Sequence, residues 1–390
     1  LLAGGVLGRS FLALVRVDLG FEPSSVVAFD LRGPASPRPA PGVRRATPPD
    51  YTRLEVTLND GERRRAAFNL DLERRASALP GVAAAGLTSQ LPLGGMSGSQ
   101  DVHIDGKADS PNASMDAMIA VRRASPGYLR AVGLRLVAGR WFTDRDGEGA
   151  LRVVVVNETM ARSYWGGAAV GRGLHLGSAP ARVVGIVADS RHAGPQQPAE
   201  TEVFVCSFQD PFASTLVVKA SGGAPGVRTA VEREVKAAGA GAEVVRVREL
   251  EALLSQSVAV PRIAAFVLGT FSLLALLIAV AGVHAVLEYA VARRTRETGV
   301  RLALGADPGG ILRLVLRQAL LYAAAGVVSG LSVALVFASA LSSAVYGIRP
   351  ADPTSAALAC VLLLGAVVAA AWRPARRASR VDAALSLRSE

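Results

Sequence analysis

The sequence predicts an α+β domain with mixed sheets and β-α-β units, joined to an α-helical transmembrane domain. Three observations lead to this fold class. Apolar residues (AVILMFWYC) make up 51% of the 390 residues and charged residues only 19%, against about 25% in a typical soluble chain. Short β-rich runs alternate with helical stretches between residues 24 and 261. The last third of the chain holds three long runs without a formal charge.

The chain begins with an apolar stretch. Leu1–Val15 contains one charged residue, Arg9, and Arg16 follows directly. A signal peptide would place its basic residues before the apolar run rather than within and after it. We therefore expect residues 1–15 to be the end of a truncated transmembrane helix, with Leu1–Leu7 as its last turns. On this interpretation the sequence is a fragment of a longer protein.

Residues 24–261 are predicted to form the α+β domain. The predicted strands, where β-branched and aromatic residues cluster, are Val26–Leu31, Val82–Thr88, Met118–Arg122, Val153–Val156, Arg182–Val187, Glu202–Ser207, Thr215–Lys219 and Glu243–Val247. The helical stretches between them are Arg63–Leu79, Glu158–Trp165 and Pro225–Ala238. Asn157 is placed to cap the second helix. Residues 33–49 contain six prolines, which favour a loop of extended polyproline character.

Residues 262–390 are predicted to hold three transmembrane helices. Ile263–Leu287 has 25 residues without a formal charge, Ala319–Ile348 has 30 and Pro353–Trp372 has 20. About 20 apolar residues of α-helix cross a hydrocarbon core of about 30 Å. One such run could be the buried helix of a soluble protein, but three in succession favour a membrane domain. We expect helices at about 263–289, 319–345 and 353–372.

The arginines around these runs predict their orientation. Six arginines lie between the first and second runs, one between the second and third, and five after the third. Short loops rich in Lys and Arg face the cytoplasm. The loop 290–318 and the C-terminal tail are therefore predicted to be cytoplasmic, and the domain 24–261 extracytoplasmic. Residues 262–390 also carry +7 of the net charge of +11, so the basic charge lies beside the membrane and does not favour a nucleic-acid partner.

The residue patterns of common catalytic and metal sites are absent from the sequence. No GxxxxGK[ST] motif is present to bind the phosphates of ATP, and no HExxH or CxxC spacing occurs. The two cysteines, Cys206 and Cys360, cannot form a multi-cysteine zinc site. His284 lies within the first predicted span, near its end, where a neutral imidazole can reach the membrane interface. The sequence therefore predicts no catalytic residue, no metal ligand and no cofactor.

The loop 290–318 contains the most specific motif of the chain. Its centre reads Arg-Arg-Thr-Arg-Glu-Thr-Gly-Val-Arg-Leu-Ala-Leu-Gly-Ala over residues 293–306, and Asp307-Pro308 is a strong helix start. The pattern predicts a short amphipathic helix at the cytoplasmic surface. Such a helix can be a lipid-headgroup anchor or a docking element for a cytoplasmic partner.

This motif resembles the R-T-R-E-I-G-I-R-x-A-L-G-A segment of MacB/FtsX-type ABC transporter permeases, with Thr298 as its one notable departure. Other stretches resemble the extracytoplasmic core domain of that family: Leu79–Val82, Gln90–Gly94, Val132–Phe142, Val155–Thr159, Val170–Arg172 and Val184–Asp189. Arg16–Phe21 resembles the segment after the first membrane helix in the duplicated permeases abundant in acidobacteria, of which this chain would be the C-terminal half.

The resemblance implies a non-enzymatic permease subunit in a bacterial inner membrane. A separate ABC ATPase subunit would hydrolyse ATP, dock on the cytoplasmic loop and drive efflux or mechanotransmission through a dimeric or pseudo-dimeric permease in the lipid bilayer. The implied docking residues are Arg294, Arg296, Glu297, Gly299, Arg301, Gly305 and Ala306. Two alternatives stay open: a membrane-anchored extracytoplasmic sensor or scaffold without transport, and a membrane-anchored hydrolase, which the lack of a catalytic constellation disfavours.

Overall fold

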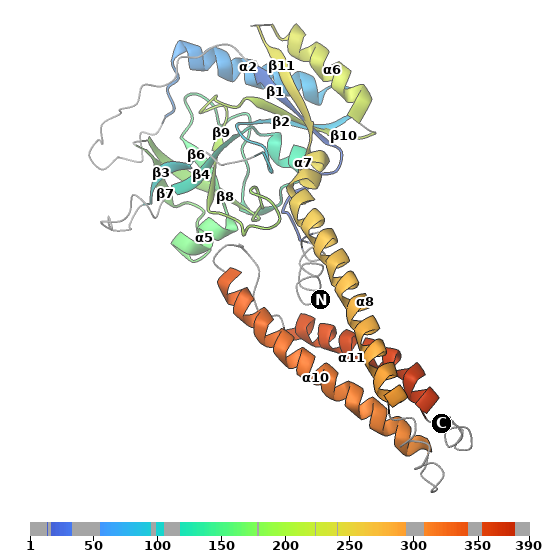
Figure 1. Ribbon diagram of the computed structural model, residues 1–390. Coiled ribbons are helices and arrows are strands. Elements are labelled where there is room, and N and C mark those ends of the chain that lie inside the picture. The colour runs from blue at the N-terminus through green and yellow to red at the C-terminus, as the bar shows by residue number, and fades with distance from the viewer. Residues whose placement is uncertain are drawn as a thin grey trace, which may run out of the picture. The chain divides into compact units, whose positions relative to one another are not determined.

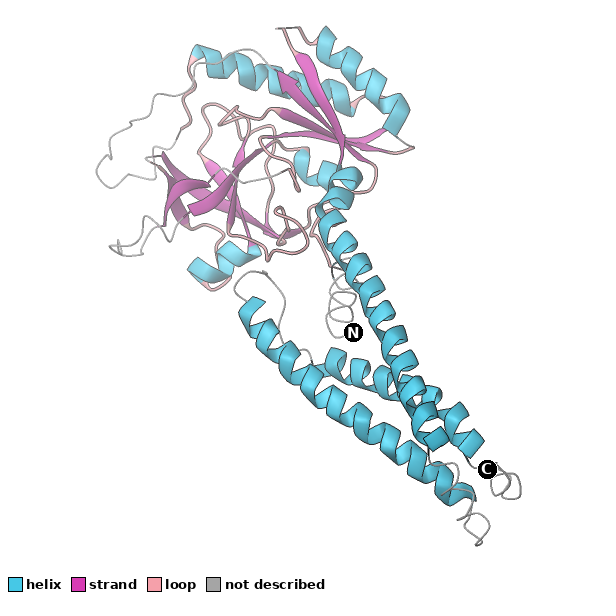
Figure 2. Ribbon diagram, viewed as in Figure 1, coloured by secondary structure: helices cyan, strands magenta, loops and turns pink. Residues whose placement is uncertain are grey.

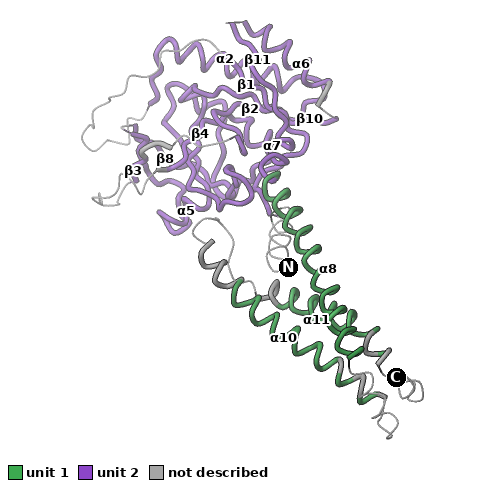
Figure 3. The backbone as a smooth tube through the Cα atoms, viewed as in Figure 1, with its two compact units in different colours: residues 1–16, 259–390 green, residues 17–258 purple. Residues whose placement is uncertain are grey.

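The computed structural model describes residues 14, 17–32, 55–94, 99–104, 118–177, 179–222, 224–239, 241–293, 308–341 and 353–378. The chain divides into two compact units, residues 17–258 and residues 1–16 with 259–390 (Figure 3). We call them the α+β unit and the helical unit. The proline-rich segment 33–49 and, apart from Leu14, the apolar segment 1–15 lie outside the described residues.

One part of the sheet of the α+β unit consists of four antiparallel strands in the order β11-β1-β10-β2 (Figure 1), and Thr88 of β2 pairs with Ala124 to continue the sheet into its second part. Its elements follow one another as two βαβ units. The elements are β1 (Val26–Arg32), α2 (Asp60–Ser77), β2 (Val82–Thr88), β10 (Thr215–Ala220), α6 (Ala224–Ala237) and β11 (Glu243–Glu249). This is the ferredoxin-like split-βαβ arrangement. Residues 89–214 are inserted between its two halves.

The inserted segment forms a closed ring of six strands. In ring order these are β4 (Met118–Ala124), β3 (Ser99–Ile104), β7 (Gly173–Leu176), β8 (Ala179–Val187), β6 (Val153–Asn157) and β9 (Glu202–Cys206), which pairs with β4 again. The pairs β4–β9 and β6–β8 are parallel, whereas the other ring pairs are antiparallel. The prediction of a mixed sheet is therefore confirmed.

Alternation along the strands distributes apolar side chains between separate cores. In β6, Val154 and Val156 join a cluster with residues from all six ring strands, whereas Val153 and Val155 join a second cluster. In β1, Val27 and Phe29 pack against α2 and α6 in a third cluster. Successive side chains of a strand point to opposite faces, so β1 and β6 each contribute to two cores.

The shorter elements of the unit were not predicted. They are β3, β7, β5 (Leu136–Gly139, paired with β8), α4 (Tyr128–Val132) and α7 (Leu250–Ser257). The first two interrupt their apolar pattern with His103 and His175, which pair with each other across β3 and β7. β5 and α4 have four and five residues, too few for a period to show. Asn59 begins α2 with a capping box that includes Glu62, earlier than the predicted start at Arg63.

The helical unit contains α8 (Ala259–Arg293), α10 (Pro308–Leu341) and α11 (Pro353–Ala378) (Figure 2). The starts at Pro308 and Pro353 agree with the predicted starts. Among the described residues, two helical stretches are long and apolar enough to cross a membrane, Leu250–Arg293 and Leu316–Val333. In α11 the apolar stretch Ala357–Arg373 is shorter, so the third span stays a prediction.

A small apolar core holds the three long helices together. Leu287 of α8, Ala319 and Ala323 of α10, and Val367 and Ala371 of α11 are its buried members. The Nδ1 atom of His284 lies 3.0 Å from the carbonyl oxygen of Ala370, and thereby joins α8 to α11. The sequence places His284 near the end of its predicted span, whereas α8 continues to Arg293. The imidazole contacts a backbone carbonyl of α11.

Candidate functional site

The candidate site of the α+β unit begins where the parallel strands β6 and β8 end. The last residues of the two strands, Asn157 and Val187, are register partners. The carboxyl ends of adjacent parallel strands meet at one edge of a sheet, where ligands often bind in α/β proteins. The polar residues that follow, Glu158 and Thr159 after β6 and Asp189 after β8, therefore lie together.

Asn157 organises this edge. Its Oδ1 accepts hydrogen bonds from the backbone N–H of Met160 at 3.0 Å, which caps α5 (Glu158–Trp165), and from that of Glu202 at 3.1 Å. Its Nδ2 donates to Asp189 Oδ1 at 2.9 Å and to the Glu200 carbonyl at 2.7 Å. The predicted cap and helix bounds are thus confirmed, and one buried amide ties together three segments distant in sequence.

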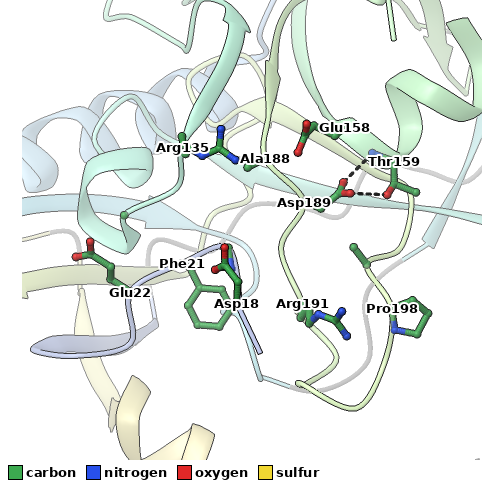
Figure 4. A pocket seen from close by; sticks show the side chains of 13 residues that line it. Asp18, Phe21, Glu22, Arg135, Glu158, Thr159, Ala188, Asp189, Arg191 and Pro198 are labelled. Carbon is green, nitrogen blue, oxygen red and sulfur yellow. Dashed lines mark hydrogen bonds between the residues drawn. The ribbon is translucent and has the colours of Figure 1, made fainter. Parts of the chain in front are cut away.

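Asp189 completes the N-terminus of α5. Its Oδ1 accepts a bond from the Thr159 backbone N–H and its Oδ2 one from the Thr159 hydroxyl, both at 2.7 Å (Figure 4). Arg162 donates to Oδ2 at 2.6 Å. A carboxylate at this position is stabilised by the free N–H groups and dipole of the helix. Asp189 is therefore fixed in position and its charge is balanced.

A buried ionic cluster of Arg122 and Glu202 contacts Ser190 and His192, which follow Asp189 in the chain. Glu202 Oε1 accepts bonds from Nε and Nη2 of Arg122 at 3.2 and 3.0 Å, and both side chains are 1% exposed. Glu202 Oε2 accepts a bond from the Ser190 hydroxyl at 3.2 Å and lies 3.5 Å from His192 Nε2. Asp189 and Arg191 line a cavity, whereas Ser190 and His192 are buried. Alternate residues of this segment therefore face the cavity and the buried cluster.

Burial dominates the protonation of this cluster. Burial raises the pKa of Glu202 to about 7, although the Arg122 guanidinium opposes this shift. Burial, and then the positive charge of Arg122, hold the pKa of His192 well below its ordinary value. His192 is therefore a neutral imidazole at neutral pH, and the Arg122 guanidinium is the positive charge that faces Glu202.

The cavity has a volume of about 580 Å³. The lining is Asp18, Gly20, Phe21, Glu22, Gly133, Arg135, Glu158, Thr159, Ala188, Asp189, Arg191, Pro198 and Ala199 (Figure 4). Gly20, at φ 75°, brings the N-terminal segment against the strand end, since a Cβ there would lie 2.0 Å from the Asp189 carbonyl oxygen. Leu19 O also accepts a bond from the Arg191 backbone N–H at 2.9 Å.

The residues predicted to dock a cytoplasmic partner are not part of this site. The described residues end at Arg293 and resume at Pro308. Arg294, Arg296, Glu297, Gly299, Arg301, Gly305 and Ala306 consequently lie outside the described residues. Within the described ranges, no group of three or more His, Cys, Asp or Glu side chains could hold a metal ion.

Sequence reasoning did not identify the cavity. Two of the stretches that resemble the family's core domain, Val155–Thr159 and Val184–Asp189, end at its polar edge. The available signal was a polar residue directly after each of two β-rich runs. Its use required the knowledge that β6 and β8 are parallel neighbours.

Comparison with known protein families gives two matches in series. Residues 37–238, just over half of the chain, match the MacB-like periplasmic core domain, and residues 269–383 match the FtsX-like permease C-terminal domain. The chain belongs to the MacB/FtsX permease family. Proteins of this family are inner-membrane proteins with a periplasmic domain.

Curated relatives of this permease carry export names. The pyoverdine export ATP-binding/permease protein PvdT of Pseudomonas putida is 27% identical over 266 residues, which cover 65% of this chain and 40% of that protein. The macrolide export ATP-binding/permease protein MacB of Chromobacterium violaceum is 27% identical over 288 residues, which cover 69% and 43%. The chain thus spans about two fifths of the length of these relatives.

Two solved structures are also similar. The periplasmic region of MacB from Actinobacillus actinomycetemcomitans aligns with a TM-score of 0.38 at 12% identity, over 62% of this chain and 95% of that one. The extracellular domain of the noncanonic ABC-type transporter YknZ from Gram-positive bacteria aligns with a TM-score of 0.33 at 16% identity, over 56% and 100%.

Proposed function

We propose that this chain is the permease part of an ABC exporter, which transmits ATP-driven motion of an ATPase from the cytoplasmic loop 290–318 to the α+β unit. The observation that carries the proposal is the FtsX-like match over residues 269–383, which includes the loop and most of the three long helices. Curated relatives combine ATP-binding and permease functions in one protein and are named for export. An ATPase partner, outside residues 1–390 or on another chain, accords with those names.

The helix lengths suit such transmission. At 1.5 Å per residue, the 35 residues of α8 extend over about 52 Å, well beyond a hydrocarbon core of about 30 Å. Only Val258 separates α8 from α7, which belongs to the α+β unit. A helix of this length can transmit displacement because its backbone hydrogen bonds are satisfied internally along its whole course.

The ATPase contact is proposed to lie on the loop residues Arg294, Arg296, Glu297, Gly299, Arg301, Gly305 and Ala306. Glu297 and Arg301 are four residues apart and share one face if this segment is helical. An exposed pair is worth about 0–1 kcal/mol to stability. A charged contact buried against a partner costs about 2–5 kcal/mol of binding when it is truncated. The size of the effect therefore separates a headgroup anchor from a docking surface.

The test is co-purification of the chain with its ATPase and measurement of the stimulated ATP turnover. Glu297→Ala and Arg301→Ala are expected to leave membrane insertion unchanged and to weaken ATPase association at least tenfold. Arg373→Ala, at the cytoplasmic end of the third predicted span, is the matched control and should have no effect. Parent-like association of both loop variants would identify the loop as a headgroup anchor. If no ATPase co-purifies even with the parent chain, the sensor or scaffold alternative is favoured.

A further inference from the structure

Nearly half of the residues that line the cavity of the α+β unit are charged. Asp18, Glu22, Glu158, Asp189, Arg135 and Arg191 all contribute to it. Its volume of about 580 Å³ lies within the range of about 300–1,000 Å³ that is usual for small-molecule sites. The uncharged part of the lining consists mostly of small residues, such as Gly20, Gly133 and Ala188. This composition suits a polar, charged ligand rather than an apolar one.

Two of the four carboxylates already have cationic partners close by. Asp189 pairs with Arg162 at 2.6 Å, and Glu22 pairs with Lys219. Glu158 has only a distant contact with Arg162, at 3.8 Å. Asp18 accepts a bond from the Gly20 backbone N–H at 2.9 Å and has no ion pair among the described residues. Asp18, with Glu158 second, is therefore the carboxylate available to a cation.

The two guanidinium groups of the lining have no carboxylate partner in the described part of the chain. Arg191 donates to the carbonyl oxygens of Pro195 at 3.2 Å and Gln197 at 2.8 Å, which orient its side chain but leave its charge unbalanced. The Arg135 side chain forms no hydrogen bond or ion pair with any described residue. Guanidinium groups bind carboxylates in charge-assisted, often bidentate, pairs.

We propose that this cavity binds a peptide-like zwitterion, with its carboxylate on Arg135 and Arg191 and its ammonium group on Asp18. A ligand with both charges balances the groups that the protein leaves unbalanced, whereas an anion or a cation alone balances one sign. This side of the cavity is preorganised. Asp189 accepts a hydrogen bond from the Thr159 backbone N–H of α5, and Ser190, the next residue, donates one to Glu202. The proposal concerns binding by residues 17–258 and does not rest on coupling to an ATPase.

Saturation-transfer NMR on the full chain in dodecyl maltoside micelles tests the proposal, with trialanine as the probe. A ligand of this size is expected to bind with a dissociation constant on the order of 0.1–1 mM. N-acetyltrialanine lacks the ammonium group and trialaninamide lacks the carboxylate. Each is expected to bind about tenfold more weakly than trialanine. Equal binding of the three compounds, or no binding of trialanine at 10 mM (about tenfold above the expected constant), overturns the proposal.

Variants assign the two charges. Arg135→Gln is expected to weaken trialanine about tenfold and to leave trialaninamide unchanged, because the amide never used the guanidinium. Asp18→Asn is expected to weaken trialanine and to leave N-acetyltrialanine unchanged. Arg145→Gln is the matched control, since Arg145 is exposed, lies outside the lining and forms no ion pair within the described residues. If Arg135→Gln binds trialanine like the parent, the assignment of the carboxylate is wrong.

Discussion

The two units of the chain treat apolar surface in opposite ways. The α+β unit buries its apolar residues in three clusters and closes six of its strands into a ring. In the described part of the helical unit, the core cluster has five buried residues, while large side chains such as Phe266 and Ile278 are exposed at 74% and 73%. Exposed apolar surface costs about 25 cal/mol per Å² in water. The first unit is therefore built for water, and the second for an apolar environment.

Polar groups differ between the units in the same sense. The α+β unit buries a complete ion pair, Arg122 with Glu202, and supports it with hydrogen bonds from neighbouring segments. In the helical unit the described members of the buried core are all apolar, and His284 of α8 contacts a backbone carbonyl oxygen of α11. We therefore expect the α+β unit to be most sensitive to the removal of a buried charged group. We expect the helical unit to be most sensitive to a charge introduced on its exposed apolar surface.

The largest effect is expected from breaking the buried pair. Glu202→Ala leaves Arg122 charged and enclosed, and should lower the free energy of unfolding of the α+β unit by about 3–5 kcal/mol. Urea unfolding of the full chain in micelles, followed by tryptophan fluorescence, to which the buried Trp141 contributes, measures this loss. Glu232→Ala removes an exposed partner, of Arg228, and should cost about 0–1 kcal/mol. Equal losses in the two variants would contradict the comparison.

A second experiment replaces one exposed apolar residue of each unit with aspartate. Ile278→Asp, near the centre of the first predicted span, should cost about 2.5–3.5 kcal/mol of membrane insertion. Val245→Asp, at a 54% exposed position of β11, should change stability by only about 0.5 kcal/mol, as surface substitutions in water do. The fraction of chain that resists alkaline carbonate extraction measures insertion. Full insertion of the Ile278→Asp chain would show that this face of α8 does not contact lipid.

Local patterns predicted much of the fold. Val82–Thr88 and Glu158–Trp165 have the predicted bounds, because a continuous apolar run or an Asn cap marks each of them. The ring of strands could not be predicted, since β4 pairs with β9 about 80 residues later and two of the ring strands carry histidines. Non-local pairing leaves no trace in an 11–18-residue window.

The candidate site was less accessible to sequence reasoning than the fold. The cap Asn157 could be predicted from its neighbours, but the carboxylate that completes the cap, Asp189, is 32 residues away. Arg122 belongs to a predicted strand, where an arginine normally points to solvent, and only the tertiary structure gives it Glu202 as a buried partner. The proposed docking residues carry a strong motif, yet they lie outside the described residues and stay a prediction.

The smallest predicted effect concerns Glu73 of α2, a buried carboxyl that joins the two parts of the α+β unit. Its Oε1 accepts a bond from the backbone N–H of Gly127 at 2.8 Å, just after β4. Burial raises the pKa of Glu73 to about 7, while hydrogen bonds from Ser125 and Gly127 oppose the shift. Asp144 adds to the increase and Arg130 reduces it. In the unfolded chain the same carboxyl titrates near its ordinary value of 4.5.

Because the folded state binds this proton more tightly, Glu73 stabilises the α+β unit fully below about pH 4.5 and loses that contribution as the pH rises through 7. Each pH unit in this window changes the free energy of unfolding by at most about 1.4 kcal/mol. Between pH 5 and pH 8 we expect a total of about 1–3 kcal/mol. Glu73→Gln keeps the acceptor oxygen for Gly127 but cannot ionise. The variant should therefore match the parent at pH 5 and exceed its stability at pH 8, in urea unfolding followed by Trp141. If the difference between the two proteins does not change with pH, the Glu73 carboxyl does not titrate in this window and its burial has no influence on the pH response of the unit.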